Sequence, residues 1–348
     1  MMTYYNYQSI ILNKFDADIT KLEDDPKILP LIKQYINDAA EVLYRFSIPW
    51  MKKEAILALK AKYSTGTLTV TSASATITGV GTVFTRDMKG QKIVITDGTD
   101  GTVVYRISEF TDSTHLVLET PYIHTGGAGL TYAIYYDTYT LDKDFKTLVE
   151  MKNITSVEYD STYMLNSSSS STPSQIIFMG VTYAPYYNTG TITTTSNSAT
   201  ITGIGTSWDS TMVGKYIQIG NYGKIFKITT VSSGTEIILD SVFPTVLTEV
   251  KYQINPIGLQ QIRFISAPTV AYLIPYTFYP KSPVLYDDTD TFPIPSDTII
   301  ILGATWLYQK ANEWGSQNQT KTDFEKELAR LTLIKIEEVQ TNVFPVIH

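Results

Sequence analysis

Four consecutive side chains in the last third of the chain could bind a metal ion. Asp287, Asp288, Thr289 and Asp290 follow one another directly, and oxygen atoms of carboxylates are the ligands that Ca²⁺ prefers in proteins. The run lacks the glycine and the distal glutamate of a calcium-binding EF-hand loop. The alternative is a solvated acidic turn before a helix, and the sequence favours this second interpretation.

Histidine and cysteine, which often serve as metal ligands or catalytic groups, are scarce. The chain has no cysteine, which leaves no disulfide, thiolate site or thiol nucleophile. Its three histidines, His115, His124 and His348, have no metal-ligand or triad spacing. No pair of acidic residues stands out as the two carboxylates of a glycosidase. We therefore expect no enzyme activity, no metal and no cofactor.

Two Gly-x-Gly pairs, 79–81 and 203–205, are candidates for phosphate loops. Neither is followed by Lys-Ser/Thr or by the start of a helix, so tight turns or bulges are the better interpretation. The abundant Tyr and Thr could form a carbohydrate-binding face, because aromatic rings stack on sugars. Half-buried strand faces explain these residues more simply.

Composition narrows the classes of partner. The 348 residues carry a net charge of −7, and the chain lacks a strong basic cluster, which argues against tight binding of nucleic acid. The sequence shows no signal peptide and no apolar run long enough for a membrane span. Charged residues make up only 18%, while Tyr occurs 25 times. Such a surface favours assembly with other protein surfaces, although a generally Tyr-rich composition is the alternative.

The chain contains an internal repeat. Residues 65–82 and 189–206 match at an offset of 124, with 14 of 18 positions identical, and weaker matches continue to Tyr132 and Tyr252. Both copies alternate Thr, Val and Ile between glycine-bearing turns, which is typical of short antiparallel strands. We predict two inserted all-β modules, 63–136 and 187–254, each a small barrel or sandwich, because closure removes edge strands.

The remaining segments contain helical patterns. Apolar residues at helical spacing predict a helix after Pro30, which Pro49 ends. A second helical run begins with Ser296 as N-cap and stops at Gly315, and a capping box at Thr322 predicts a third helix. The fold class we expect is α+β. A discontinuous helical-bundle body with a small sheet would comprise 1–62, 137–186 and 255–348, opened at two surface loops by the β modules.

This ordered set of segments resembles the head-to-tail adaptor (connector, or neck) proteins of tailed bacteriophages. The resemblance rests on Ile48-Pro49-Trp50, on 139–145 (YTLDKDF), on 180–183 (GVTY) and on the run from 276 to 306. Asp142 stands where the family usually has proline. The two modules resemble β repeats of phage particle proteins.

The resemblance implies a virion structural protein with no enzymatic role. It implies a ring, commonly twelvefold, that binds the portal protein and tail or further neck proteins and extends the DNA channel. DNA would pass without tight binding, because an acidic wall repels phosphates. The protein would occupy the neck or tail of the virion, and the host cytoplasm during assembly. The ring number, the face that meets the portal, the orientation of the modules and the host stay open.

Both termini are candidates for the partner interface, because they are apolar or aromatic and lack obvious internal partners. We expect one of them to order on the portal or on an adjacent subunit. The residues concerned are Tyr4, Tyr5, Tyr7, Val343, Phe344, Val346 and Ile347. The alternative function is a tail or surface adhesin whose duplicated modules bind host glycans. That alternative explains the duplication and the Tyr content but leaves the split body unexplained.

Overall fold

The chain divides into two compact units. The computed structural model describes residues 1–14, 28–97, 101–152, 154, 156–158, 175–181, 186–255, 258–265 and 268–341. Unit 1 comprises Met1–Glu54, Asp144–Val149 and Thr277–His348, and unit 2 comprises Ala55–Lys143 and Glu150–Tyr276. The domain boundaries expected from the sequence stay a prediction, and each unit is described by itself below.

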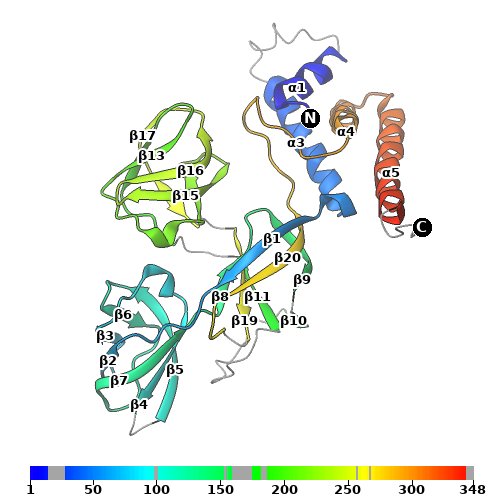
Figure 1. Ribbon diagram of the computed structural model, residues 1–348. Helices are drawn as coiled ribbons and strands as arrows, with labels where there is room; N and C mark the ends of the chain where they lie inside the picture. The colour runs from blue at the N-terminus through cyan, green and yellow to red at the C-terminus, as the bar shows by residue number, and fades with distance from the viewer. Residues whose placement is uncertain are drawn as a thin grey trace, which may run out of the picture. The chain divides into compact units, whose positions relative to one another are not determined.

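Unit 1 holds the α-helices that the structure describes, which pack as one group in Figure 1. Pro30 lies in the first turn of the second helix, and its buried residues Ile32, Ile36 and Leu43 share one face. The helix predicted after Pro30 is therefore confirmed. The bounds are α1 (Tyr4–Asn13), α3 (Ile28–Arg45), α4 (Asp297–Ala311) and α5 (Gln317–Thr341), with a 3₁₀ helix η1 (Pro49–Met51).

A glycine in α4 lets this helix approach two other helices, α3 and α5, closely. A β-carbon on Gly303 of α4 would lie 3.0 Å from the Ala39 β-carbon of α3 and 3.2 Å from the Phe324 ring of α5. Ala304 beside it is fully buried. Small residues at 303–304 thus allow α3, α4 and α5 to share one apolar core, which also includes α1.

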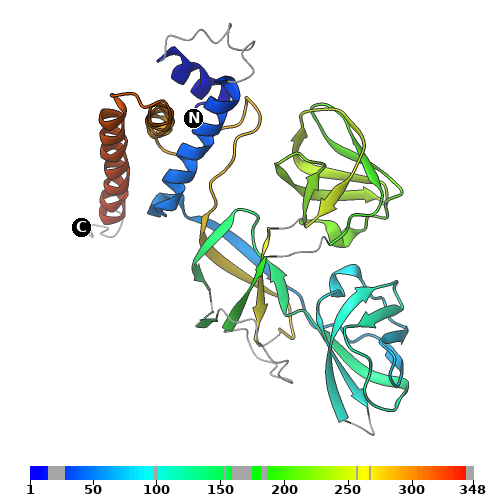
Figure 2. The same ribbon diagram turned by 180° about the vertical axis from the view of Figure 1, so that it is seen from behind.

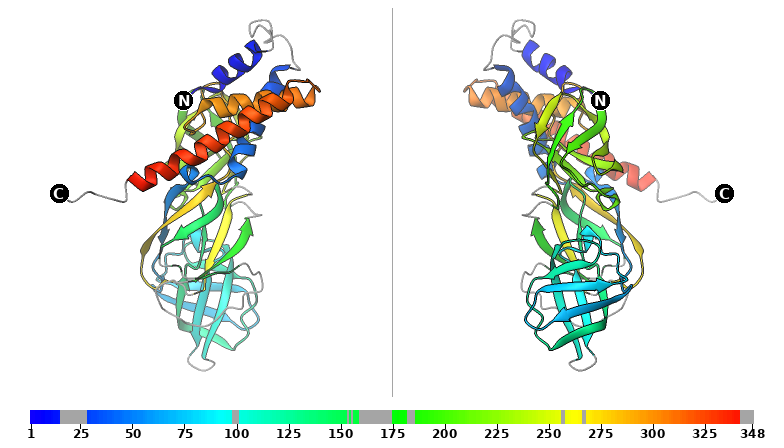
Figure 3. Two further views of the ribbon diagram at one scale, coloured as in Figure 1. Left: turned by 90° about the vertical axis from the view of Figure 1, so that its right-hand side faces the viewer. Right: turned by 90° about the vertical axis from the view of Figure 1, so that its left-hand side faces the viewer.

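The expected ends of the C-terminal helices are partly wrong. Ser296 precedes α4, but its hydroxyl donates to Glu327 Oε1 (2.7 Å) and makes no cap bond. The helix α4 ends at Ala311 rather than near Gly315. The capping box predicted at Thr322 is also wrong, because α5 already begins at Gln317 and runs unbroken in Figure 3. The Thr322 hydroxyl instead donates to the carbonyl of Asn318 (2.9 Å) inside the helix.

The expected helical-bundle body is wrong. The protein is mostly β, with 41% strand and 24% helix, and the described residues contain only four α-helices. Much of the expected body is made of strands, and the side chains of β1 and β20 alternate between buried and exposed along the chain. These strands are β1 (Lys53–Leu59), β8 (Thr138–Thr140), β9 (Phe145–Met151), β10 (Ser156–Glu158), β11 (Gln175–Val181), β19 (Gln260–Phe264) and β20 (Tyr272–Pro280).

These strands form two small sheets. One has the order β1-β20-β9. The other has the order β10-β11-β19-β8, with β10 parallel to β11 and the remaining pairs antiparallel.

The first repeat copy is a closed six-stranded barrel in unit 2. Its strand order is β2-β3-β6-β5-β4-β7, and β7 pairs with both β2 and β4, which leaves no free edge. Leu68, Ile77, Ile93, Leu116 and Ile134 are fully buried inside it. The strands are β2 (Thr67–Thr71), β3 (Thr76–Val80), β4 (Lys92–Asp97), β5 (Gly101–Phe110), β6 (His115–Leu118) and β7 (Gly126–Tyr135), with a 3₁₀ helix η2 (Arg86–Met88).

The second copy repeats this strand order. Its sheet runs β17-β12-β13-β16-β15-β14-β18, and β17 and β18 together take the place of β7, interrupted at Lys251. Figure 2 shows both modules from behind. The strands are β12 (Thr191–Thr194), β13 (Ser198–Ile204), β14 (Tyr216–Ile219), β15 (Ile225–Ser233), β16 (Glu236–Phe243), β17 (Leu247–Val250) and β18 (Tyr252–Ile254), with a 3₁₀ helix η3 (Ser210–Met212).

The repeat extends to individual hydrogen bonds. The Tyr132 hydroxyl donates to the Thr65 carbonyl (2.5 Å), and its equivalent Tyr252 donates to Thr189 (2.7 Å). Each module also contains a second tyrosine whose hydroxyl accepts a backbone N–H. Tyr63 accepts from Val83 in one copy (2.6 Å), and Tyr187 accepts from Ser207 in the other (2.7 Å). The high Tyr content of the modules is therefore explained in part by hydrogen bonds that lie within each copy and recur in the other.

Replacing Gly190 by alanine should destabilise the second module more than the matched change Gly214→Ala. Both glycines have left-handed backbones, with φ of +85° and +80°. A β-carbon on Gly190 would collide with the Ile204 carbonyl oxygen, whereas Gly214 faces open space. We expect a loss of about 1–2 kcal/mol for Gly214→Ala from the backbone alone, and about 3 kcal/mol or more for Gly190→Ala.

Urea denaturation measures these losses, and hydrogen exchange across 187–254 assigns them to the module. Equal losses for the two variants would contradict the proposed clash.

Candidate assembly interface

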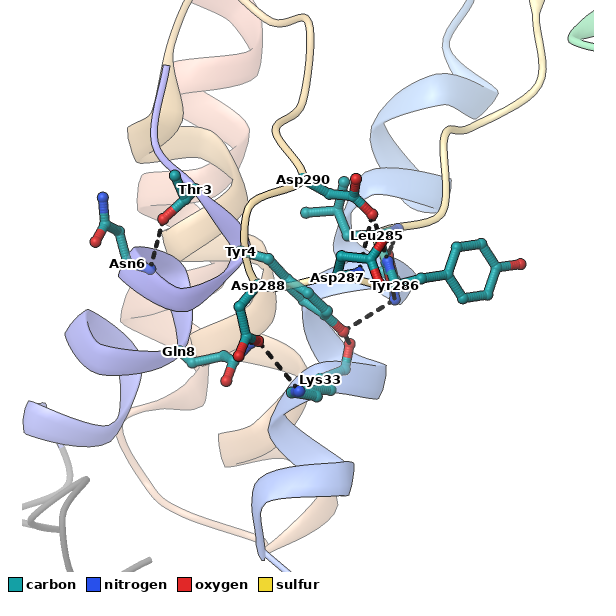
Figure 4. A network of polar contacts seen from close by, with 11 residues as sticks. Thr3, Tyr4, Asn6, Gln8, Lys33, Leu285, Tyr286, Asp287, Asp288 and Asp290 are labelled. Carbon is teal, nitrogen blue, oxygen red and sulfur yellow. Dashed lines mark hydrogen bonds and ion pairs between the residues drawn. The ribbon is translucent and has the colours of Figure 1, made fainter. Parts of the chain in front are cut away.

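The acidic run that the sequence singled out serves as the anchor of the first helix. The first N–H groups of an α-helix have no partner within the helix. In α1, the N–H of Tyr4 donates to the Asp290 carbonyl (2.8 Å) and that of Tyr5 to the Asp288 carbonyl (3.1 Å). Thr3 adds a side-chain cap, with its hydroxyl oxygen accepting the N–H of Asn6 (3.3 Å). Figure 4 shows the turn seated at the start of the helix.

The carboxylates of this turn are engaged with protein groups. Asp290 Oδ2 accepts the backbone N–H groups of Tyr286 (2.9 Å) and Asp287 (3.0 Å). Asp288 Oδ1 accepts from Gln8 Nε2 (3.2 Å) and from Lys33 Nζ (3.3 Å). Among the described residues no group of three or more His, Cys, Asp or Glu side chains could hold a metal ion. The carboxylates of Asp288 and Asp290 therefore hold the turn, α1 and α3 together.

Tyr4 connects α1 to α3. Its hydroxyl donates to the Lys33 carbonyl (2.8 Å) and accepts from Asn37 Nδ2 (3.2 Å). Burial raises the pKa of Tyr4 far above its ordinary value, so the hydroxyl stays protonated and remains a donor. Asn37 also holds the loop: its amide accepts the Leu285 N–H (2.9 Å) and donates to the Leu285 carbonyl (3.2 Å).

Tyr7 connects α1 to α4. Its ring is fully buried, and its hydroxyl donates to Asp297 Oδ1, which also accepts the N–H of Met2 (3.2 Å). Burial, and then the hydrogen bond to the Asp297 carboxylate, raise the pKa of Tyr7 strongly. The expectation that the N-terminal arm lacks internal partners is therefore wrong for Tyr4 and Tyr7. Their hydroxyls and rings are used inside unit 1.

The segments that meet at this junction still expose large apolar side chains. We define the junction face as four of them: Tyr5 (43% exposed) on α1, Leu31 (43%) on α3, and Val284 (50%) and Tyr286 (38%) on the loop. Of the predicted interface residues, only Tyr5 belongs to this face. The other three were missed, because sequence periodicity does not reveal which apolar residues of a helix or loop stay uncovered.

Val343, Phe344, Val346 and Ile347 lie outside the described residues. His115 Nδ1 lies 3.0 Å from the carboxylate of Asp112 within a turn of the first module, and His124 packs against the ring of Tyr122.

Comparison of the chain with protein-family models and with curated proteins gave no match. No helix in the described part of the chain combines the length and the apolar character that a membrane crossing requires.

Removing the Tyr7 hydroxyl should loosen α1, whereas the same change at Tyr5 should not. Tyr7→Phe deletes a buried bond to a carboxylate, for which we expect a loss of about 1.5–3 kcal/mol of unfolding free energy. Tyr5→Phe alters an exposed ring and should stay within about 0.5 kcal/mol of the wild type.

Urea unfolding gives both values, and faster hydrogen exchange in α1 should accompany the first change alone. Equal behaviour of the two variants would show that the bond to Asp297 does not anchor the helix.

Proposed function

We propose that the chain is a structural protein of a tailed-phage particle that assembles into a head-to-tail adaptor ring between the portal and the tail. The observation that carries the proposal is the junction face. Three segments remote in sequence are tied together by hydrogen bonds, yet each presents apolar side chains to solvent. Apolar side chains that stay exposed on firmly bonded segments are available to a protein that covers them.

The ordered resemblance to adaptor proteins supports the same function. A ring arises when one surface patch binds a different patch on the next copy and the rotation closes. The junction face would supply one of these two patches, with the neighbouring subunit or the portal supplying the other. The net charge of −7 fits a channel that DNA passes without adhering, because each subunit repels phosphates. No catalytic residue is required for this role.

Mass photometry and negative-stain microscopy of the full chain, alone and mixed with its portal protein, test the proposal. We expect rings of one fixed stoichiometry. A protein that remains monomeric in both conditions would exclude the adaptor function.

Charges placed on the junction face should break the ring. The double change Leu31→Asp and Tyr286→Asp leaves the buried core intact but puts carboxylates in an apolar contact. We expect the apparent dissociation constant of the assembly to rise about tenfold or more. The matched control is Ile123→Asp, an exposed apolar residue of the first β module.

The control should assemble like the wild type. If Ile123→Asp disrupts the rings and the double variant does not, the interface lies on the module instead. The thermal unfolding profile of each variant separates loss of assembly from loss of fold.

A further inference from the structure

Unit 2 contains a pocket of about 510 Å³ that the adaptor function does not use. Its walls come from four parts of this unit: residues 57–60 at the end of β1, the first β module, the second β module, and the strands β8 and β19. The volume falls within the range of about 300–1,000 Å³ that small-molecule sites occupy.

Equivalent segments of the two modules meet beside the pocket. The 3₁₀ helices η2 and η3 correspond at the offset of 124, and Met88 and Met212 are their buried anchors. Between them, the Arg86 guanidinium lies 5.3 Å from the Phe110 ring and 4.9 Å from the Tyr187 ring. Arg86 Nε is also 3.6 Å from Asp209 Oδ2. Cation–π contacts and an ion pair therefore join the modules next to the pocket wall that contains Asp87.

Asp87 brings a buried acceptor to this wall. Its side chain is only 9% exposed, and one oxygen pairs with the Lys60 ammonium. The other oxygen, Oδ1, has no hydrogen-bond partner in the described structure. Burial acts to raise the pKa of Asp87, but the hydrogen bonds from Lys60 and Thr85 and the charges of Lys60 and Lys215 outweigh it and lower the pKa. The carboxylate is thus ionised, and its Oδ1 atom alone is left without a donor.

Lys215 brings a donor to the same pocket. Its ammonium lies 4.1 Å from the centre of the Tyr186 ring. Among the described residues no acceptor of a hydrogen bond from this ammonium is found. Tyr186 itself is fixed, since its hydroxyl is 2.9 Å from Thr211 Oγ1 and its N–H donates to Ile254 (2.9 Å). The Lys215 ammonium therefore retains donor capacity for a ligand.

The charge of the pocket is opposite to that of the chain. Lys60, Lys89, Lys215 and Arg263 line it together with one carboxylate, Asp87, whereas the whole chain carries −7. A positive pocket attracts an anion. The buried Asp87 oxygen, however, repels an anion that carries no O–H group. The combination selects a ligand with both a negative charge and hydroxyl donors.

We propose that this pocket binds an acidic sugar, a uronic acid unit of a polysaccharide. Its carboxylate would pair with the Lys215 ammonium, and one of its hydroxyls would donate to Asp87 Oδ1. The tyrosine side chains in the wall, Tyr136 and Tyr186, offer apolar surface to the sugar ring. This binding is separate from ring assembly, and neither property depends on the other.

Titration calorimetry of the full chain with trigalacturonate tests the proposal, with maltotriose and inorganic phosphate as comparison ligands. Maltotriose has the hydroxyls without the charge, and phosphate has the charge with few donors. We expect trigalacturonate to bind at least about tenfold more tightly than either, because the charge-assisted contact and the hydroxyl contact are both needed.

Lys215→Met removes the ammonium while keeping a long apolar stem, and should weaken trigalacturonate binding about tenfold or more. The matched control is Lys227→Met, at an exposed lysine of β15 outside the pocket. It should bind like the wild type.

The affinity should also depend on pH through Lys215. Burial lowers the pKa of Lys215 to about 8, with Asp87 and Asp209 acting to raise it and Lys60 to lower it. Tyr186, packed against it, stays neutral because burial raises its pKa strongly. Binding should therefore weaken between pH 7 and about 9 as the ammonium loses its proton, and this dependence should be absent in Lys215→Met.

Three results would overturn the proposal. They are absence of trigalacturonate binding by the wild type at millimolar ligand, equal binding of phosphate or maltotriose, and unchanged affinity in Lys215→Met. The comparison of ligands uses the wild type alone, so it stands even if a variant fails to fold.

Discussion

The requirement that each buried backbone N–H and C=O find a partner shapes both units of this protein. In unit 2 the requirement is met by closure, since β7 pairs with strands on both of its sides. In unit 1 it is met by an acidic turn, whose carbonyls receive the first N–H groups of α1 from the other end of the chain. Side chains then add to this backbone pairing, as Asn37 does at Leu285.

The duplicated modules show which parts of a sequence carry a fold and which are free to change. Buried aliphatic residues and the tyrosine-to-carbonyl bonds recur in both copies, because the barrel depends on them. The 3₁₀ helices do not repeat their charges: Arg86 and Asp87 correspond to Ser210 and Thr211. Two identical surfaces of like charge would repel where they meet. The divergence allows Arg86 of one copy to pair with Asp209 of the other.

The sequence was sufficient to predict the repeat, the β character of both copies and the helix α3, because these depend on local alternation and periodicity. The sequence failed to predict the strands in place of a helical body. Short strands such as β1 and β9 contain too few residues for an alternation pattern to outweigh the helical patterns around them. It failed for Tyr4 and Tyr7 because their partners, Lys33 and Asp297, are defined only by tertiary packing. The differences in charge between the repeat copies were the signal that could have indicated the pocket.

The ends of each module lie next to each other. Tyr63 and Ile134 exchange two backbone hydrogen bonds (2.9 and 2.7 Å) at the entry and exit of the first module, and Tyr187 and Ile254 form the equivalent bridge in the second. A protein chain that receives an insertion at such a point keeps the residues before and after the insertion close together, whatever the inserted module contains. Genetic recombination could therefore exchange, delete or add a whole module as a cassette without moving the residues on either side. Duplication of this particular unit within one gene is a natural outcome of that geometry.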